Sequence, residues 1–196
     1  MIVGLTGGIG SGKTWVSSLF EDLGIPIYIS DIEAKKIMHL NKEVKNSIIE
    51  LFGDQAYEEG QLNRGLISKK VFNNKDLLNQ LNAIVHPAVD SHFKNWYTNQ
   101  KSPFVIKESA IIFEIGAEKK CDATILITAP KEIRIQRVQK RDSISVEAIE
   151  LRMNNQWEDE KKEPLANYII ENINKEETIL KVKEVYNSIL STNYKC

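Results

Sequence analysis

The chain has little of what would place it among membrane, nucleic-acid-binding or disulfide-rich proteins. Only two of its 196 residues are cysteines, Cys121 and Cys196, without the paired spacing of a zinc site. We expect two unpaired, reduced thiols. The net charge of −1 creates no global positive field for DNA, RNA or an anionic membrane. No apolar run approaches the length of a membrane span, and the first residues lack a basic n-region and a cleavage site. We therefore expect a cytoplasmic protein, a monomer or weak homo-oligomer, with no nucleic-acid or membrane partner.

What is present is typical of a globular protein with one hydrophobic core, since 42% of the residues are hydrophobic and 27% are charged. Short apolar runs predict buried strands at 2–6, 26–29, 104–106 (continuing toward 108), 123–128 and 168–170. Helical periodicity separates them at 12–23, 33–40, 44–52, 76–85, 88–97, 133–140, 146–155 and 178–190. Parallel strands buried on both faces read as continuous apolar runs. The sequence therefore predicts an α/β fold of three layers, with a five-stranded parallel sheet flanked by helices.

A glycine-rich segment follows the first predicted strand and opens the first helix. Gly7–Thr14 matches G-x-x-x-x-G-K-[ST] in full, the pattern of a phosphate-binding loop (P-loop). Backbone N–H groups of such a loop point at phosphate oxygens, and the helix dipole adds positive potential. We expect ATP to be held by Gly8, Ile9, Gly10, Ser11, Gly12, Lys13 and Thr14. Lys13 would hold the β/γ-phosphates and Thr14 would offer its hydroxyl to Mg²⁺; the alternative is a chance glycine-rich turn.

Asp31 follows the second predicted strand, at the edge of the sheet where α/β proteins bind ligands. A carboxylate there can accept the proton of an attacking hydroxyl during phosphoryl transfer. The alternative is a helix N-cap, because Ser30 and Asp31 precede a helical pattern. We favour the role of catalytic base.

Three arginines, Arg134, Arg137 and Arg141, fall at i, i+3 and i+7 on one face of a predicted helix. Guanidinium groups suit phosphate oxygens and stabilise charge on a transferring phosphoryl group. A solvated face paired with Glu132, Asp142 and Glu147 is the alternative. Because mobile lids of small kinases commonly follow this strand, we favour a role in catalysis.

These features organise the chain as a single P-loop kinase domain over 1–196. The core is expected at about 1–32 and 102–196, with a helical insertion on the substrate side at about 33–101 and a helical lid at about 137–160. The insertion is too long for a simple crossover between two strands.

At this point the chain resembles the dephospho-coenzyme A kinase family. The resemblance rests on Gly4–Thr14, Leu23–Pro26 leading to Ile29–Asp31, Gly60-x-Leu62-x-Arg64, Leu81–Pro87, Phe113-Glu114, Arg137-x-x-x-Arg141-Asp142, Arg152-x-x-x-Gln156 and Asn172. It covers nearly the whole chain.

The resemblance implies transfer of the ATP γ-phosphate, with Mg²⁺, to the ribose 3′-hydroxyl of dephospho-CoA. It places the catalytic base at Asp31 and the lid arginines at Arg137 and Arg141, and adds Asn172 to the ATP-binding residues. It also implies that Arg64 and His86 bind substrate from the helical insertion. One alternative is that Arg64 is an ordinary surface arginine. The other is that His86 is a boundary residue kept extended by Pro87, which then starts the next helix.

The sequence departs from the family pattern at four points: Ile29 stands for the first Asp of D-x-D, Trp15 for a small hydroxyl residue, Ala110 for a proline and Asn167 for an aspartate. Two alternative functions are a kinase of nucleoside monophosphates, shikimate or gluconate, and a non-catalytic ATP-binding regulator. A third alternative is a nucleic-acid-binding ATPase, but the sequence lacks the aromatic–basic strip that such a protein would use. Because Asp31 and Lys13 are both present, we expect an active enzyme.

Overall fold

The structure, a computed structural model, describes residues 1–72 and 74–193, so Cys196 lies outside the described residues. The chain divides into two compact units, one of residues 1–28 and 100–196 and the other of residues 29–99. The limits expected for the core, the insertion and the lid stay a prediction.

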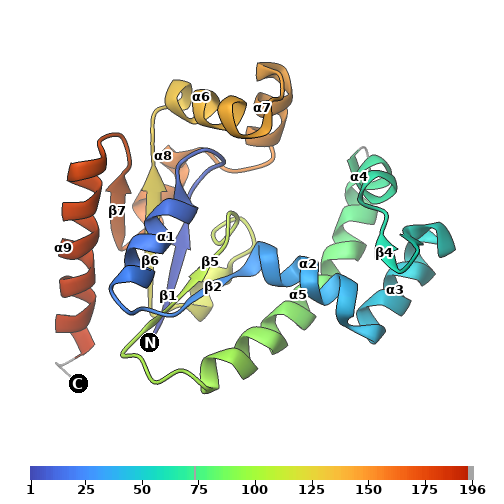
Figure 1. Ribbon diagram of the computed structural model, residues 1–196, viewed down its shortest axis with the longest axis horizontal. Helices are drawn as coiled ribbons and strands as arrows, with labels where there is room; N and C mark the ends of the chain where they lie inside the picture. Colours follow the sequence, from blue (N-terminus) through green and yellow to red (C-terminus); the bar gives the residue numbers. More distant parts are fainter. Residues whose placement is uncertain (73, 194–196) are drawn as a thin grey trace. The chain divides into compact units, whose positions relative to one another are not determined.

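A five-stranded sheet with the order β2-β5-β1-β6-β7 builds the first unit (Figure 1). Its strands are β1 (Ile2–Thr6), β2 (Ile27–Ile29), β5 (Val105–Glu108), β6 (Ala123–Thr128) and β7 (Tyr168–Glu171). β1 pairs in parallel with β5 and β6, and β6 pairs in parallel with β7. The predicted α/β fold with a parallel sheet is confirmed.

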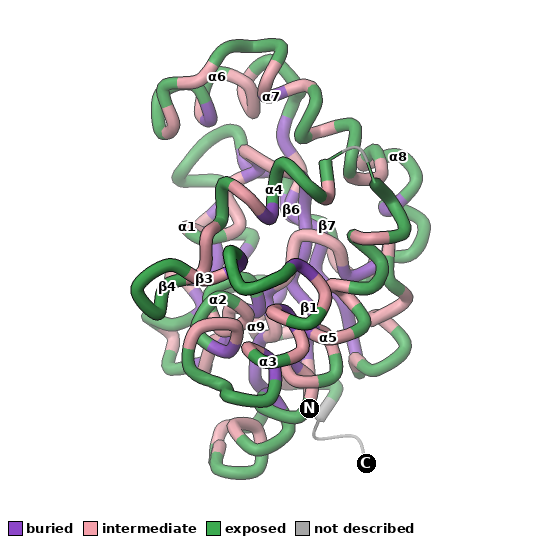
Figure 2. The backbone as a smooth tube through the Cα atoms, turned by 90° about the vertical axis from the view of Figure 1, so that its right-hand side faces the viewer, coloured by how far each residue is buried: buried purple, intermediate pink, exposed green. Residues whose placement is uncertain are grey.

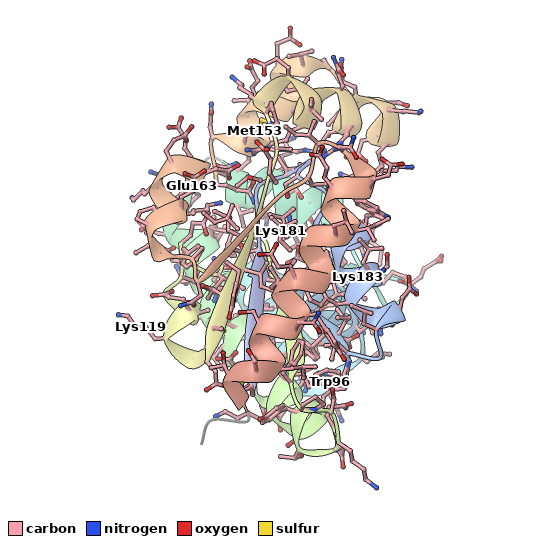
Figure 3. All side chains as sticks on the ribbon, turned by 90° about the vertical axis from the view of Figure 1, so that its left-hand side faces the viewer. Trp96, Lys119, Met153, Glu163, Lys181 and Lys183 are labelled. Atoms are coloured by element: carbon pink, nitrogen blue, oxygen red, sulfur yellow. The ribbon has the colours of Figure 1, made fainter. Side chains whose placement is uncertain are left out.

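The helices and helical turns of this unit are α1 (Lys13–Asp22), η2 (Ala117–Lys120), α6 (Lys131–Asp142), α7 (Val146–Met153), α8 (Asp159–Lys162), η3 (Glu163–Leu165) and α9 (Lys175–Asn193). α1 and α9 share one face, where Phe20 and Val185 pack into one core with Leu5 and Ile127. Figure 2 shows β1 and β6 as largely buried. Figure 3 looks onto α9, whose exposed Lys181 and Lys183 are labelled.

The sequence explains why β1 and α1, the two elements on either side of the first turn, form where they do. Residues 3–6 of β1 are buried because β5 and β6 flank the strand and both faces of the sheet are covered. α1 buries Val16 and Phe20 and ends before Gly24, whose φ of 82° suits a helix stop. The turn between strand and helix is therefore held from both sides.

The second unit consists mainly of helices. Its elements are α2 (Ser30–Leu40), α3 (Lys42–Phe52), η1 (Asp54–Ala56), β3 (Tyr57–Glu58), β4 (Gln61–Leu62), α4 (Arg64–Phe72) and α5 (Lys75–Thr98). α5 packs against α2, α3 and α4, and β3 and β4 form a short antiparallel hairpin. Within the described ranges, none of the helices combines the length and the apolar character needed to cross a bilayer.

The prediction of two helices at 76–85 and 88–97 is wrong, because α5 runs through Pro87 without a break. Proline removes one backbone hydrogen bond and disfavours helical backbone in the residue before it. Val85, Val89 and Phe93 are nonetheless buried along one side of α5. We attribute the continuity to this packing, and His86 is accordingly a helical residue rather than an extended boundary.

Candidate active site

The P-loop joins the carboxyl end of β1 to the start of α1, below α6 in Figure 1. Gly10 and Gly12 have φ of 81° and 96°, a region that residues with a side chain rarely adopt. The loop closes on itself, since the Ser11 N–H donates to the Gly8 carbonyl at 3.1 Å and the Val16 N–H to Gly12 at 3.1 Å. The first helical turn of α1 thus continues from the loop.

The loop glycines are also needed because residues distant in the sequence pack closely against them. A Cβ atom on Gly8 would collide with the Arg134 guanidinium, and one on Gly12 would collide with the Asn172 amide. The glycines therefore make room for two side chains of the protein as well as for phosphate.

Lys13 lies against the inside of the loop. Its ammonium donates to the Gly7 carbonyl at 2.8 Å and to the Gly8 carbonyl at 3.4 Å. The neighbouring Thr14 is exposed at the start of α1. Ser11 is buried, and within the described chain its hydroxyl oxygen has no hydrogen-bond partner. A buried hydroxyl and an ammonium in a glycine loop fit phosphate oxygens.

Arg134 and Arg137 of α6 both bind the loop backbone. Arg134 Nε donates to the Ile9 carbonyl at 3.0 Å, and Arg137 Nη1 donates to the Ser11 carbonyl at 3.3 Å. Arg137 also donates to the Asn172 carbonyl at 2.8 Å. These side chains bring the positive charge of α6 to the phosphate-binding loop.

Arg141, the third arginine of the predicted face, is placed differently. Its side chain is 63% exposed and donates two hydrogen bonds to Asp142, at 2.7 and 2.9 Å. Arg152 donates to the same carboxylate at 3.3 Å. The hydrogen bond from Arg141 lowers the pKa of Asp142 below its ordinary value. Arg141 thus lies in an exposed ion-pair group and not against the loop.

Asn172 closes the loop from the end of β7. Its side-chain amide donates to the Ser11 carbonyl at 2.8 Å, and its backbone N–H donates to Thr128 at 2.8 Å. The Thr178 hydroxyl contacts the Asn172 side-chain oxygen at 3.4 Å. Asn172 is 3% exposed, so these hydrogen bonds fix a buried polar group between the sheet and the loop.

A second group of polar contacts holds the far end of the predicted lid, and the sequence analysis assigned no function to its members Gln156 and Asp159. Gln156 accepts from the Ile9 N–H at 2.8 Å and donates to the Ala110 carbonyl at 3.3 Å. Asp159 pairs with Arg134 at 3.2 Å, and both side chains are 12% exposed. Burial raises the pKa of Asp159, against the pull of Arg134 and Lys162. The resemblance to Arg152-x-x-x-Gln156 was the sequence signal for Gln156, and no signal pointed to Asp159.

Lys162 of α8 is fully buried beside Glu114. The two charged atoms are 3.0 Å apart, and Glu114 also accepts from the Trp157 N–H at 3.0 Å. Within residues 1–72 and 74–193 the ammonium has no aligned hydrogen bond, so the attraction is that of an ion pair. It joins α8 to the segment that follows β5.

Side-chain oxygen donors lie along α1 and at the end of β5. Thr14 offers a hydroxyl, and the Ser17 hydroxyl contacts the buried Glu108 carboxylate at 3.5 Å. In the described residues no cluster of three or more histidine, cysteine, aspartate or glutamate side chains suits a resident metal. The chemistry of these oxygen donors fits Mg²⁺, which prefers oxygen ligands.

The remaining predicted site residues lie in the helical unit. Asp31 is exposed in the first turn of α2, after the N-cap position Ile29, and it makes no cap hydrogen bond. Its carboxylate has no hydrogen-bond or ion-pair partner among the described residues. Arg64 begins α4 and is exposed, whereas His86 is half-buried in α5. The N-cap alternative for Asp31 therefore does not describe the structure.

The family model and the curated relatives name the same family. The family model described as dephospho-CoA kinase matches residues 1–177. The dephospho-CoA kinase of Bacteroides fragilis (strain YCH46) is 36% identical over 184 residues, 93% of this chain and 90% of its own length. The solved dephospho-CoA kinase from Campylobacter jejuni is 26% identical, with a TM-score of 0.70 and 98% coverage of both chains. A crystal structure from Thermus thermophilus is 29% identical, with a TM-score of 0.89 and 96% coverage of each chain.

Proposed function

Because this chain belongs to the dephospho-CoA kinase family, we propose that it transfers the γ-phosphate of ATP to the ribose 3′-hydroxyl of dephospho-CoA. The products are coenzyme A and ADP, and the reaction completes coenzyme A biosynthesis. One observation carries the proposal: a glycine loop that holds Lys13 inside it is bound from outside by Arg134, Arg137 and Asn172.

The loop holds the nucleotide. N–H groups of Gly8–Thr14 and the Lys13 ammonium bind the β- and γ-phosphates, and Asn172 keeps the Ser11 carbonyl turned away from them. Thr14 and, through Ser17, Glu108 are the residues that would hold Mg²⁺. Mg²⁺ held there would neutralise negative charge on the phosphates.

Asp31 acts on the acceptor. Its exposed carboxylate, without a competing partner in the described chain, orients the 3′-hydroxyl and accepts its proton. The hydroxyl oxygen forms a bond to the γ-phosphorus as the bond from that phosphorus to the bridging oxygen of ADP breaks. Arg64 and His86 bind dephospho-CoA from the helical unit.

Arg137 and Arg141 act on the transferring phosphoryl group at two different stages of the reaction. Arg137 already lies at the loop, so its charge is in place when ATP binds. Arg141 reaches the phosphoryl group by giving up its ion pair with Asp142 and binding phosphate oxygens instead. This requires the lid to move between Arg137 and Gln156, which are both held at the loop. We place the reaction in the cytoplasm, where ATP and reduced thiols coexist.

The variant Asp31→Asn tests the assignment of the base. We expect kcat for coenzyme A formation to fall about 10²- to 10⁴-fold, because the amide cannot accept the proton. The thermal unfolding temperature and the Kd for ATP should stay unchanged, since Asp31 is exposed. Asp76→Asn, in the exposed first turn of α5, is the matched control. Turnover near that of the wild type in Asp31→Asn would show that Asp31 is not the base.

A further inference from the structure

The tip of the phosphate-binding loop, Gly8–Gly10, is covered by one residue of a distant helix. Arg134 of α6 lies so close that a Cβ atom on Gly8 would meet its guanidinium and one on Gly10 would meet its backbone. The Arg134 Nε donates to the Ile9 carbonyl at 3.0 Å. A displacement of this guanidinium would therefore release the Ile9 carbonyl and open space over Gly8.

Asp159, at the start of α8, holds the other side of the Arg134 guanidinium. Its Oδ2 accepts from Arg134 Nη1 at 3.2 Å, and both side chains are 12% exposed. Hydrogen bonds between charged groups are stronger than neutral ones, and more so where water is largely excluded. Just before α8, Gln156 accepts from the Ile9 N–H at 2.8 Å. Both polar groups of the Ile9 backbone are thus held by side chains from outside the loop.

The short helix that carries Asp159 is itself anchored on both sides. The Trp157 N–H, two residues before Asp159, donates to the Glu114 carboxylate at 3.0 Å. Lys162, three residues after Asp159 and fully buried, lies 3.0 Å from the same carboxylate. Asp159 therefore holds Arg134 from a fixed backbone position.

We propose that Asp159 is a positioning residue for ATP binding, which acts through Arg134 by holding its guanidinium against the loop. This inference rests on the proposed function only in taking ATP as the ligand of the loop. It needs no contact between Asp159 and either substrate. A loop that is already held in its binding shape loses less conformational entropy when phosphates bind, so its affinity for ATP is higher.

The same carboxylate also carries a negative charge near the loop. Burial raises the pKa of Asp159, and the charges of Arg134, Lys162 and Lys13 oppose that rise. A carboxylate that acted on the phosphates through its charge would repel them, so its removal would tighten ATP binding. Positioning predicts the opposite sign, and the two roles can therefore be separated by experiment.

The test measures the Kd for ATP by calorimetric titration without an acceptor. Asp159→Ala should raise this Kd about 10-fold, because a charge-assisted hydrogen bond that fixes the loop is lost. Asp159→Asn removes the charge but keeps an oxygen that can accept from Arg134, so it should retain most of the affinity that Asp159→Ala loses. At saturating ATP the KM for dephospho-CoA should stay unchanged in both variants.

A double-mutant cycle shows whether Asp159 acts through Arg134. Arg134→Gln should also raise the Kd for ATP, and Asp159→Ala/Arg134→Gln should bind ATP no more weakly than the weaker of the two single variants. The double variant leaves neither charge of the pair without its partner, so it serves even if a single variant folds poorly. Glu160→Ala, at the exposed next position of α8, is the matched control and should bind ATP like the wild type.

Three results would overturn the assignment of Asp159. They are an unchanged Kd for ATP in Asp159→Ala, tighter ATP binding in that variant, and losses that multiply in the double variant. A lowered unfolding temperature with an unchanged Kd would show that the contact with Arg134 only stabilises the fold. A wild type that binds ATP but forms no coenzyme A would refute the proposed function alone, because the titrations need no acceptor.

Discussion

The side-chain amide of Asn172 donates a hydrogen bond of 2.8 Å to the backbone carbonyl of Ser11, which joins the end of β7 to the P-loop. The amide occupies the space that a side chain on Gly12 would need. Arg137 binds both partners of this hydrogen bond through their backbone carbonyls. The shape of the phosphate-binding loop therefore depends on residues far from it in the sequence.

Replacing Asn172 by alanine should destabilise the protein and weaken ATP binding together. A buried polar contact is lost and the Ser11 carbonyl is left with the longer hydrogen bond from Arg137, at a cost of about 1–3 kcal/mol in the free energy of unfolding. Thermal unfolding and titration with ATP measure both effects. Asn154→Ala, at the exposed end of α7, is the matched control. An Asn172→Ala protein with wild-type stability and ATP affinity would contradict this role.

Lys13→Met should lower kcat/KM for ATP about 10²- to 10³-fold, because the fixed charge at the transferring phosphates is removed. The fold should persist, since the side chain is only half-buried and the hydrophobic stem is kept. Steady-state release of ADP measures the effect. Lys183→Met on the exposed side of α9 should behave like the wild type (Figure 3). Equal activity in the two variants would exclude Lys13 from catalysis.

Removing one partner of the buried ion pair between Lys162 and Glu114 should strongly lower the free energy of unfolding. Lys162→Met leaves the Glu114 carboxylate buried without its cation, and we expect a loss of about 3–5 kcal/mol in unfolding free energy. Lys181→Met removes an exposed pair with Glu184 and should cost less than about 1 kcal/mol. Chemical denaturation of the two variants decides the point. The double variant Lys162→Met/Glu114→Gln, which removes both charges and keeps an acceptor for the Trp157 N–H, should recover part of the loss, and no recovery would mean that the deficit is one of packing.

Cys121 should react slowly with alkylating reagents. Burial raises the pKa of its thiol from 9.0 to about 11. The thiolate is the reactive form, so at pH 8 its share is lowered roughly a hundredfold relative to an ordinary cysteine. The rate should keep rising with pH toward 11, since the folded pKa lies above the ordinary value. Alkylation of a Cys196→Ser protein, with and without denaturant, measures this rate. Fast labelling of the folded protein at pH 8 would contradict the burial of the thiol.

The sequence predicted the sheet well because its strands are continuous apolar runs between glycines or turns. Ile2–Thr6 and Ala123–Thr128 were predicted with the limits that the structure has. It failed at Pro87, where packing of α5 outweighs the local preference of proline. The β3–β4 hairpin was also missed, because strands of two residues show no periodicity.

The site could be predicted where one short segment carries the chemistry, as in Gly7–Thr14. Arg134 was recognised as part of a basic face, but its binding to Ile9 and Asp159 depends on the fold. The same holds for Lys162 and Glu114, whose attraction is unrelated to their spacing in the chain. The roles given to Asp31, Arg64, His86 and Arg141 stay predictions.

Coenzyme A formation by the purified protein tests the central claim most directly. ATP, Mg²⁺ and one acceptor at a time would be supplied, from dephospho-CoA, AMP, CMP, shikimate and gluconate, with ADP release coupled to a spectroscopic signal. We predict release that depends on dephospho-CoA, with one phosphate added at the ribose 3′-oxygen as shown by mass and NMR. Turnover with another acceptor alone, or ATP binding without turnover on any of them, would contradict the account.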